Sequence, residues 1–270
     1  MLRDYVKSLT PPIVRALPGV GRLAVRVRQH GFSGDYSSFD AALAAAGHVG
    51  YEDEAIVAHM LRSAQQQVTG AITNNTARVG FAMLATLGHA TRCRVLDFGG
   101  GVGIHFDALR PWIKADVEWV VCETPLMVTR AGAARAGDGL RFVARLEPGE
   151  AFDVVLASGV LQYVRDPSAT LADLCKRAPF TILDRVPLVD RRSDRLTVQR
   201  VNSGHRAAYP AWFFARSEFE ARLSSLGLSV VMSWDGSNDV PYWNTMGADY
   251  RGMLLQQNAA LSVNASAATP

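Results

Sequence analysis

The stretch "RVLDFGGGVGIHF", Arg94 to Phe106, joins a short apolar run to three consecutive glycines. The apolar run predicts a buried strand. The glycines have no side chains to pack, so they permit a tight turn and let another molecule lie against the backbone. In an open parallel sheet, ligands bind where a strand ends and the chain turns into the next helix. The stretch therefore predicts a strand, a ligand-binding turn and a helix, in that order.

Strand-like and helix-like segments alternate after this stretch, which predicts a parallel sheet covered by helices on both faces. We expect strands at 117–123, 140–146, 152–158, 180–186 and 228–234, and helices at 105–112, 125–137, 166–178 and 217–227.

The chain before residue 91 has a different pattern, with alanine-rich helical stretches at 37–47 and 53–68 and little that resembles a strand. We expect an N-terminal helical cap or arm over residues 1–90, a ligand-binding domain over 91–257 and a flexible tail over 258–270.

An insertion over residues 187–216 separates a predicted strand from the helix that follows it. Loops this long in a compact domain are often functional. Its polar and aromatic side chains predict either a lid over a small-molecule substrate or an aromatic plug in the core. The candidates for binding that substrate are Gln199, Tyr209 and Trp212, and His205 is a candidate catalytic residue.

The composition, 49% hydrophobic and 20% charged, is typical of a globular protein. A net charge of +3 with dispersed Lys and Arg gives no indication of nucleic-acid binding. Cys93, Cys122 and Cys175 lie in apolar runs without CxxC spacing, which predicts buried thiols in a cytoplasmic protein.

No run of 18 apolar residues predicts a transmembrane helix, and Arg15 and Pro18 interrupt any signal peptide. The basic segment 1–30 predicts either an arm packed along its own domain or a weak peripheral contact with a membrane.

The glycine spacing separates two nucleotide-binding folds. A dinucleotide fold requires GxGxxG, but the sixth position counted from Gly99 is Ile104. The chain instead carries DxGxGxG, which begins at Asp97. Glu123 then closes the next strand, where a carboxylate can accept both ribose hydroxyls of an adenosine. Because a nearby carboxylate disfavours pyrophosphate and tolerates a cation, the pattern favours S-adenosylmethionine over NAD.

These segments, with "LASGVLQYVRDP", "ILDRVPL", "DRLTVQRV" and "YPAWFF", resemble class I S-adenosylmethionine-dependent methyltransferases. More narrowly, residues 32–256 resemble a family of bacterial methyltransferases often associated with surface-polysaccharide or specialised-metabolite biosynthesis. The resemblance implies an α/β fold with a Rossmann-like seven-stranded sheet, whose final antiparallel strand is supplied by "RGMLLQQ". It also implies a cofactor site made by Asp97, Gly99, Gly100, Gly101, Gly103, Glu123, Thr124, Ser158 and Gly159. One departure is that Ala144 and Arg145 follow the third strand, where many members carry an aspartate that binds adenine.

Candidates for the acceptor chemistry follow the ends of predicted strands. They are Tyr163, Asp184, Arg185, His105 and, in the insertion, His205. Each has a structural alternative: a packed aromatic for Tyr163, a salt bridge for Asp184 with Arg185, and a core histidine for His105.

We expect methyl transfer from S-adenosylmethionine to a small molecule, most simply to a hydroxyl of a sugar or specialised metabolite. No metal site is predicted. "ASGVLQY" lacks the Asn-Pro-Pro-Tyr type of segment that stacks a flipped base, which argues against a nucleic-acid acceptor. Two alternatives stay open: a protein that binds the cofactor without catalysis, and an NAD-dependent oxidoreductase.

Overall fold

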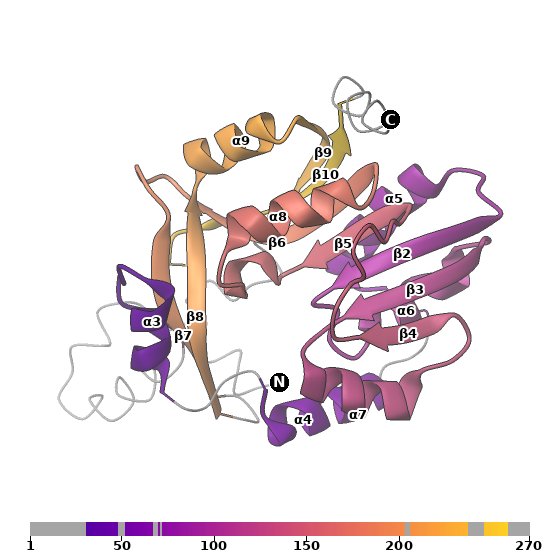
Figure 1. Cartoon of the computed structure of the whole chain (residues 1–270), viewed down its shortest axis with the longest axis horizontal. Helices are drawn as coiled ribbons and strands as arrows, with labels where there is room; N and C mark the ends of the chain where they lie inside the picture. The colour runs from indigo at the N-terminus through magenta and orange to yellow at the C-terminus, as the bar shows by residue number, and fades with distance from the viewer. Residues whose placement is uncertain are drawn as a thin grey trace.

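The computed structural model describes residues 31–47, 52–66, 70, 72–202, 206–236 and 246–258. A twisted sheet crosses the molecule with helices on both faces (Figure 1). Its core has the order β4-β3-β2-β5-β6-β10-β9, and β10 runs antiparallel to both of its neighbours. The bounds are β2 (Arg92–Phe98), β3 (Asp116–Cys122), β4 (Leu140–Val143), β5 (Val154–Ser158), β6 (Phe180–Val189), β9 (Leu228–Asp235) and β10 (Asp249–Gln257). The predicted Rossmann-like α/β fold with a final antiparallel strand is confirmed, but the sheet has ten strands in the described residues rather than the seven that we expected, because β1, β7 and β8 extend it.

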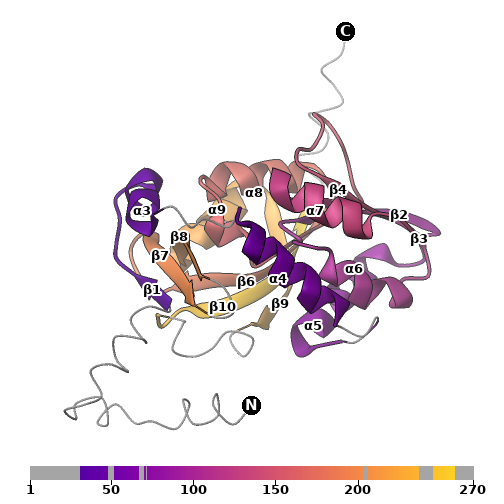
Figure 2. The same cartoon turned by 90° about the horizontal axis from the view of Figure 1, so that it is seen from below.

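Helices lie on both faces of the sheet (Figure 2), and each face buries an apolar cluster of its own. α5 (Asn74–Leu87) and α6 (Ile104–Leu109), which continues into the short η2 (Arg110–Trp112), cover one face. α8 (Pro167–Lys176) and α9 (Arg216–Ser225) cover the other. Asp166 caps α8 by accepting a hydrogen bond from the backbone N–H of Ala169 (2.9 Å).

The segment 187–216 is a β-hairpin rather than the long loop that we expected. β7 (Arg195–Asn202) pairs antiparallel with β8 (Arg206–Ala215), and β1 (Gly31–Ser33), a strand that the sequence did not predict, pairs with β7. Leu196 and Val198, two residues apart in β7, both pack against α3 (Phe39–Ala46). This spacing is expected for a strand that has one face covered. The hairpin meets the core where β8 pairs in parallel with the end of β6.

α4 (Glu54–Gln65) lies beside α7 (Pro125–Arg135), next to the carboxyl ends of β2 and β3 (Figure 1). Asp53 caps α4 through the N–H of Ala55, and an apolar cluster joins the two helices around Val57 and Met127. This packing brings α4 to the turn that follows β2.

The remaining sequence predictions concern the two ends of the chain, membrane-spanning helices and the cysteines. The basic segment 1–30 and residues 259–270 of the expected tail lie outside the described residues. None of the helices that the structure does describe is long and apolar enough to cross a membrane. All three cysteines are buried as free thiols, as predicted.

Candidate functional site

The order of the strands places one crevice at the centre of the sheet. From β2 the chain moves outward through β3 and β4, and then returns to place β5 on the other side of β2. In an open α/β sheet, ligands bind beyond the carboxyl ends of the strands at such a reversal. The turns after β2 and β5 touch there, because a Cβ at Gly99 would overlap the side chain of Val160. The glycine turn therefore forms one wall of the crevice.

Gly101 lies at the apex of this turn with a φ of 60°, a conformation that side chains rarely adopt. A Cβ at Gly101 would lie 2.6 Å from the Cε atom of Met60 on α4. The turn ends at Gly103, which is the N-cap residue of α6. Met60 was not among the residues predicted from the sequence. Its helix, α4, packs against the turn through this side chain.

Asp97 is fully buried at the end of β2. Its Oδ2 atom accepts a hydrogen bond from the indole N–H of Trp119 (3.2 Å), whereas Oδ1 has no hydrogen-bond partner. Burial raises the pKa of this carboxyl to about 7, against the opposing effect of the Trp119 bond. A buried acceptor atom without a donor is rare in a native protein and marks a place where a ligand can donate.

Glu123 follows β3 and faces the same turn. Its Oε1 accepts from the backbone N–H of Gly101 (3.1 Å), and its Oε2 accepts from the N–H of Thr124 (2.8 Å). The Oγ1 of Thr124 is buried without a partner. The structure therefore brings Asp97, Glu123, Thr124 and the glycines to one rim.

His105 lies beneath the turn, almost completely buried. Its Nδ1 has no hydrogen-bond partner and lies 3.8 Å from Oδ2 of Asp97. Burial, reinforced by the positive charge of Arg185, lowers the pKa of His105 to about 4. The imidazole is therefore neutral near pH 7.

Asp184 is buried in β6, opposite Ser158 of β5. Its Oδ2 accepts from Oγ of Ser158 (3.0 Å) and from Nδ2 of Asn75 (2.5 Å), and its Oδ1 accepts from Nε1 of Trp234 (2.9 Å). Neither Asn75, on α5, nor Trp234, on β9, was predicted from the sequence. Three donors from three elements hold this carboxylate in place.

Arg185 occupies a β-bulge. The register passes from Leu183 opposite Met253 to Val186 opposite Arg251, so that Asp184 and Arg185 together face Gly252. Arg185 has a φ of 55°, in the left-handed region that is unfavourable for a side chain of this size. The bulge brings the guanidinium to Ser158, where Nη2 donates to the backbone carbonyl and to Oγ, both at 3.2 Å.

Tyr163 ends η3 (Leu161–Tyr163), the short helix after β5. Its hydroxyl donates to Oε1 of Gln199 on β7 (2.7 Å), and its ring meets that of Tyr209 on β8 edge to face at 5.2 Å. Burial raises the pKa of Tyr163, so the phenol stays protonated near neutral pH. Gln162, which was also missed, is buried, and its Oε1 has no partner.

Trp212 links the hairpin to the same segment. Its indole N–H donates to the carbonyl of Val164 (3.2 Å), and its partly buried ring packs against the cores on both sides of it. Gln199, Tyr209 and Trp212 thus all reach the segment after β5. His205 lies outside the described residues.

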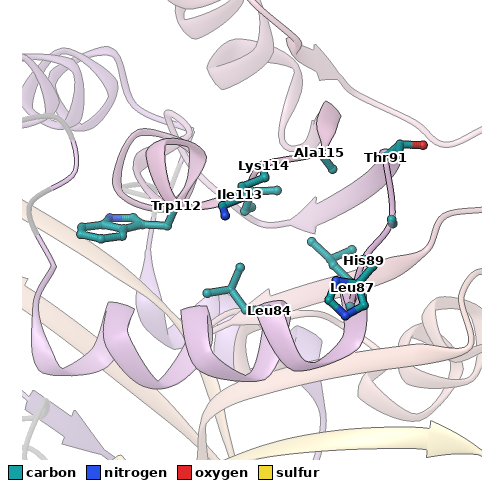
Figure 3. A pocket seen from close by; sticks show the side chains of 10 residues that line it. Leu84, Leu87, His89, Thr91, Trp112, Ile113, Lys114 and Ala115 are labelled. Atoms are coloured by element: carbon teal, nitrogen blue, oxygen red, sulfur yellow. The ribbon is translucent and has the colours of Figure 1, made fainter.

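A recess of about 540 Å³ lies at the amino ends of the strands, on the opposite side from the glycine turn (Figure 3). Leu84 and Leu87 of α5 line it together with Trp112 and Ile113. Its other lining residues include Thr91 and Ala115, directly before β2 and β3. Because it lies at the amino ends of these strands, it is separate from the crevice at the glycine turn.

Comparison with solved structures shows the same fold. An S-adenosylmethionine-dependent methyltransferase from Clostridium acetobutylicum is 12% identical, with a TM-score of 0.51 over 75% of this chain and 99% of that one. The 1,6-didemethyltoxoflavin-N1-methyltransferase of Burkholderia thailandensis is 20% identical (TM-score 0.48; 76% of this chain, 88% of that chain). The CcbJ methyltransferase of Streptomyces caelestis is 14% identical (TM-score 0.49; 72% and 94%).

Sequence comparison gives the family. No curated protein is similar enough in sequence to be counted as a relative. The family model described as "Methyltransferase domain" matches residues 64–233, which span the glycine turn, β5, the bulge of β6 and the hairpin. The chain therefore belongs to the methyltransferase domain family.

Proposed function

We propose that this protein transfers a methyl group from S-adenosylmethionine to a hydroxyl of a small molecule, either a sugar or a specialised metabolite. The observation that carries the proposal is the partnerless, buried Oδ1 of Asp97 beside a glycine turn at the reversal point of the sheet. The Clostridium acetobutylicum protein with this fold is described as S-adenosylmethionine-dependent, which supports the choice of cofactor.

The residues of the rim fit this cofactor. Asp97 and Glu123 are two carboxyl groups next to a turn that lacks side chains, an arrangement that suits a ligand with positive charges and ribose hydroxyls. Asp97 would face the cationic methionine end, and Glu123 would accept from the ribose. Thr124, with an unpartnered hydroxyl, would lie beside the ribose. When bound, S-adenosylmethionine supplies an electrophilic methyl group.

The acceptor would lie between the turn after β5 and the β7–β8 hairpin. Tyr163, Gln199 and Tyr209 make one connected wall there, and Arg185 lies on the side of Ser158. Holding the acceptor oxygen close and in line with the methyl group supplies much of the acceleration in such a displacement.

Two measurements test this function. Thermal melting with S-adenosylmethionine, and separately with NAD, identifies the cofactor, because a ligand at 100 times its Kd stabilises a protein by about 2.7 kcal/mol. We expect stabilisation by S-adenosylmethionine alone. Release of S-adenosylhomocysteine is then measured with a panel of sugars and phenols. Binding without turnover on any hydroxyl acceptor would instead support a cofactor-binding protein without catalysis.

A further inference from the structure

Arg185 is held in an unfavourable backbone conformation inside a strand that otherwise pairs regularly. A left-handed φ is unfavourable for a side chain of this size, and such strain gathers at functional sites. A glycine or asparagine would relieve it. The chain therefore tolerates strain in order to place a guanidinium at this point of the crevice.

The cation is only partly neutralised by its neighbour. Nε of Arg185 lies 3.5 Å from Oδ2 of Asp184, and it is buried without a hydrogen-bond partner. Asp184 does not close this gap, because its oxygens are already held by Asn75, Ser158 and Trp234. These donors leave Arg185 with unused hydrogen-bonding capacity.

Trp234 reaches Asp184 only because the residue between them is small. Gly252 of β10 pairs with Trp234, and a Cβ at Gly252 would overlap the indole ring. The indole therefore crosses β10 directly over Gly252 and donates to Asp184 on β6. Asn75 approaches the same carboxylate from α5. Two residues distant in sequence thus determine how Asp184 is oriented toward Arg185.

The guanidinium lies against the turn that follows β5, because a Cβ at Gly159 would come within 2.8 Å of Nη2 of Arg185. Its charge acts on His105 beneath the glycine turn and on Tyr163 beside the hairpin. Its side chain is 36% exposed, so a ligand can reach it from the acceptor half. Guanidinium groups bind carboxylate and phosphate with two parallel hydrogen bonds.

We propose that Arg185 binds an oxyanion, a carboxylate or a phosphate, on the methyl acceptor, and that Asn75 and Trp234 are positioning residues that keep Asp184 from pairing fully with it. This inference rests on the proposed function and narrows its substrate class to anionic acceptors. Asp184 serves as an anchor, and Arg185 makes the contact with the substrate.

The test uses protein saturated with S-adenosylhomocysteine and three sugars of similar size as probes: D-glucuronate, D-glucose 1-phosphate and neutral methyl glucoside. We expect one anionic sugar to bind at least about tenfold more tightly than methyl glucoside by calorimetry, the scale of one charge-assisted contact. Glucuronate and glucose 1-phosphate distinguish carboxylate from phosphate. Arg185→Gln should abolish the preference, whereas Arg110→Gln, at the far edge of the sheet, should retain it.

Trp234→Phe tests the positioning role, because it keeps the ring over Gly252 and removes only the N–H donor. We expect the preference for the anionic sugar to fall about two- to fivefold, on the scale of one hydrogen bond, with unchanged affinity for S-adenosylhomocysteine. Asn75→Leu should act in the same direction, and Trp112→Phe is the control.

Equal binding of all three sugars would overturn the inference. So would a loss of S-adenosylhomocysteine affinity in Arg185→Gln, since Arg185 would then hold the carboxylate of the cofactor. Failure of the parent protein to bind S-adenosylhomocysteine at all would count against the proposed function instead. The probes titrated without cofactor still report on Arg185 in that case.

Discussion

Glu123 accepts a hydrogen bond from the backbone N–H of Gly101, so a carboxylate at the end of β3 braces the turn at the end of β2. The same carboxylate would meet the ribose of the cofactor. Under the proposed function, turn geometry and cofactor affinity would therefore depend on one side chain.

Replacing Glu123 with alanine should weaken S-adenosylmethionine binding about ten- to a hundredfold by calorimetry, because charge-assisted hydrogen bonds worth roughly 1.5 to 3 kcal/mol are lost. Glu118 is a matched control in β3, the strand that Glu123 follows, and it pairs with Arg94 and Arg141 instead. Glu118→Ala should lower the Tm and leave cofactor affinity unchanged. Parental affinity in Glu123→Ala would refute the ribose assignment.

A side chain at Gly101 should prevent cofactor binding in a folded protein. Gly101→Val introduces a β-branched residue at a positive φ and a Cβ facing Met60, so the turn must move. Gly88 also has a positive φ, but a Cβ there would meet nothing within 4 Å. Gly88→Val should therefore lose stability and keep binding. Circular dichroism and calorimetry on both variants separate backbone strain from loss of the site.

Asp97 should make the ligand-free protein less stable as the pH rises. Its pKa is about 7 in the folded state against 3.8 for the ordinary carboxyl, so the folded state holds the proton more tightly. This contribution is complete below pH 3.8 and is lost as the pH rises to 7. Asp97→Asn should thus gain stability relative to the parent by roughly 2 to 4 kcal/mol between pH 4 and pH 8.

Urea unfolding of both proteins at several pH values measures this difference. Asp116→Asn, which replaces an exposed aspartate at the start of the neighbouring strand, is the control for the substitution itself. The Asp97→Asn variant should also lose cofactor affinity. A difference between parent and variant that does not change with pH would contradict the raised pKa.

The strain at Arg185 predicts an unusual pattern of substitutions. Arg185→Gly should be no more than about 0.5 kcal/mol less stable than the parent, because relief of the positive φ offsets the lost contacts. Arg185→Val should cost about 1 to 3 kcal/mol. Arg251, opposite the bulge, has no positive φ, so Arg251→Gly should cost about 0.5 to 1 kcal/mol. Urea titrations of the three variants provide the comparison.

Trp212→Ala distinguishes a binding residue from a structural one. The lost packing and the lost bond to Val164 should lower the free energy of unfolding by about 3 to 5 kcal/mol if the ring is mainly structural. Trp212→Phe keeps most of the packing, so it should remain folded with parental cofactor affinity. A drop in turnover of an identified acceptor in Trp212→Phe would then assign the indole to acceptor binding.

The sequence predicted the parts of the candidate site that follow the ends of neighbouring strands. Asp97, the glycines and Glu123 lie at the ends of neighbouring strands, and the geometry of a parallel sheet brings such positions together. Asn75 and Trp234 could not be found this way, because they are 109 and 50 residues from the carboxylate that they hold. Their position depends on how α5 and β9 pack.

The prediction of a long loop in place of the β7–β8 hairpin was wrong for a different reason. In β7 polar residues separate the apolar ones, and in β8 Pro210 interrupts the apolar run, so we interpreted the sequence of both strands as a loop. The hairpin is stabilised instead by contacts with β1, α3 and the end of β6, none of which is adjacent to it in sequence except β6. Tertiary contacts rather than local propensity determine its structure.

The parallel pairing between β6 and β8 has a consequence for how acceptor specificity can change. Only two residue pairs, Leu188 with Phe214 and Val189 with Ala215, make this junction in the described part of the chain. The cofactor rim lies entirely on the other side of it. A hairpin grafted from another family member between these two anchor points would therefore exchange the part of the proposed acceptor wall that Gln199 and Tyr209 form, while Tyr163 and the proposed cofactor rim stay unchanged.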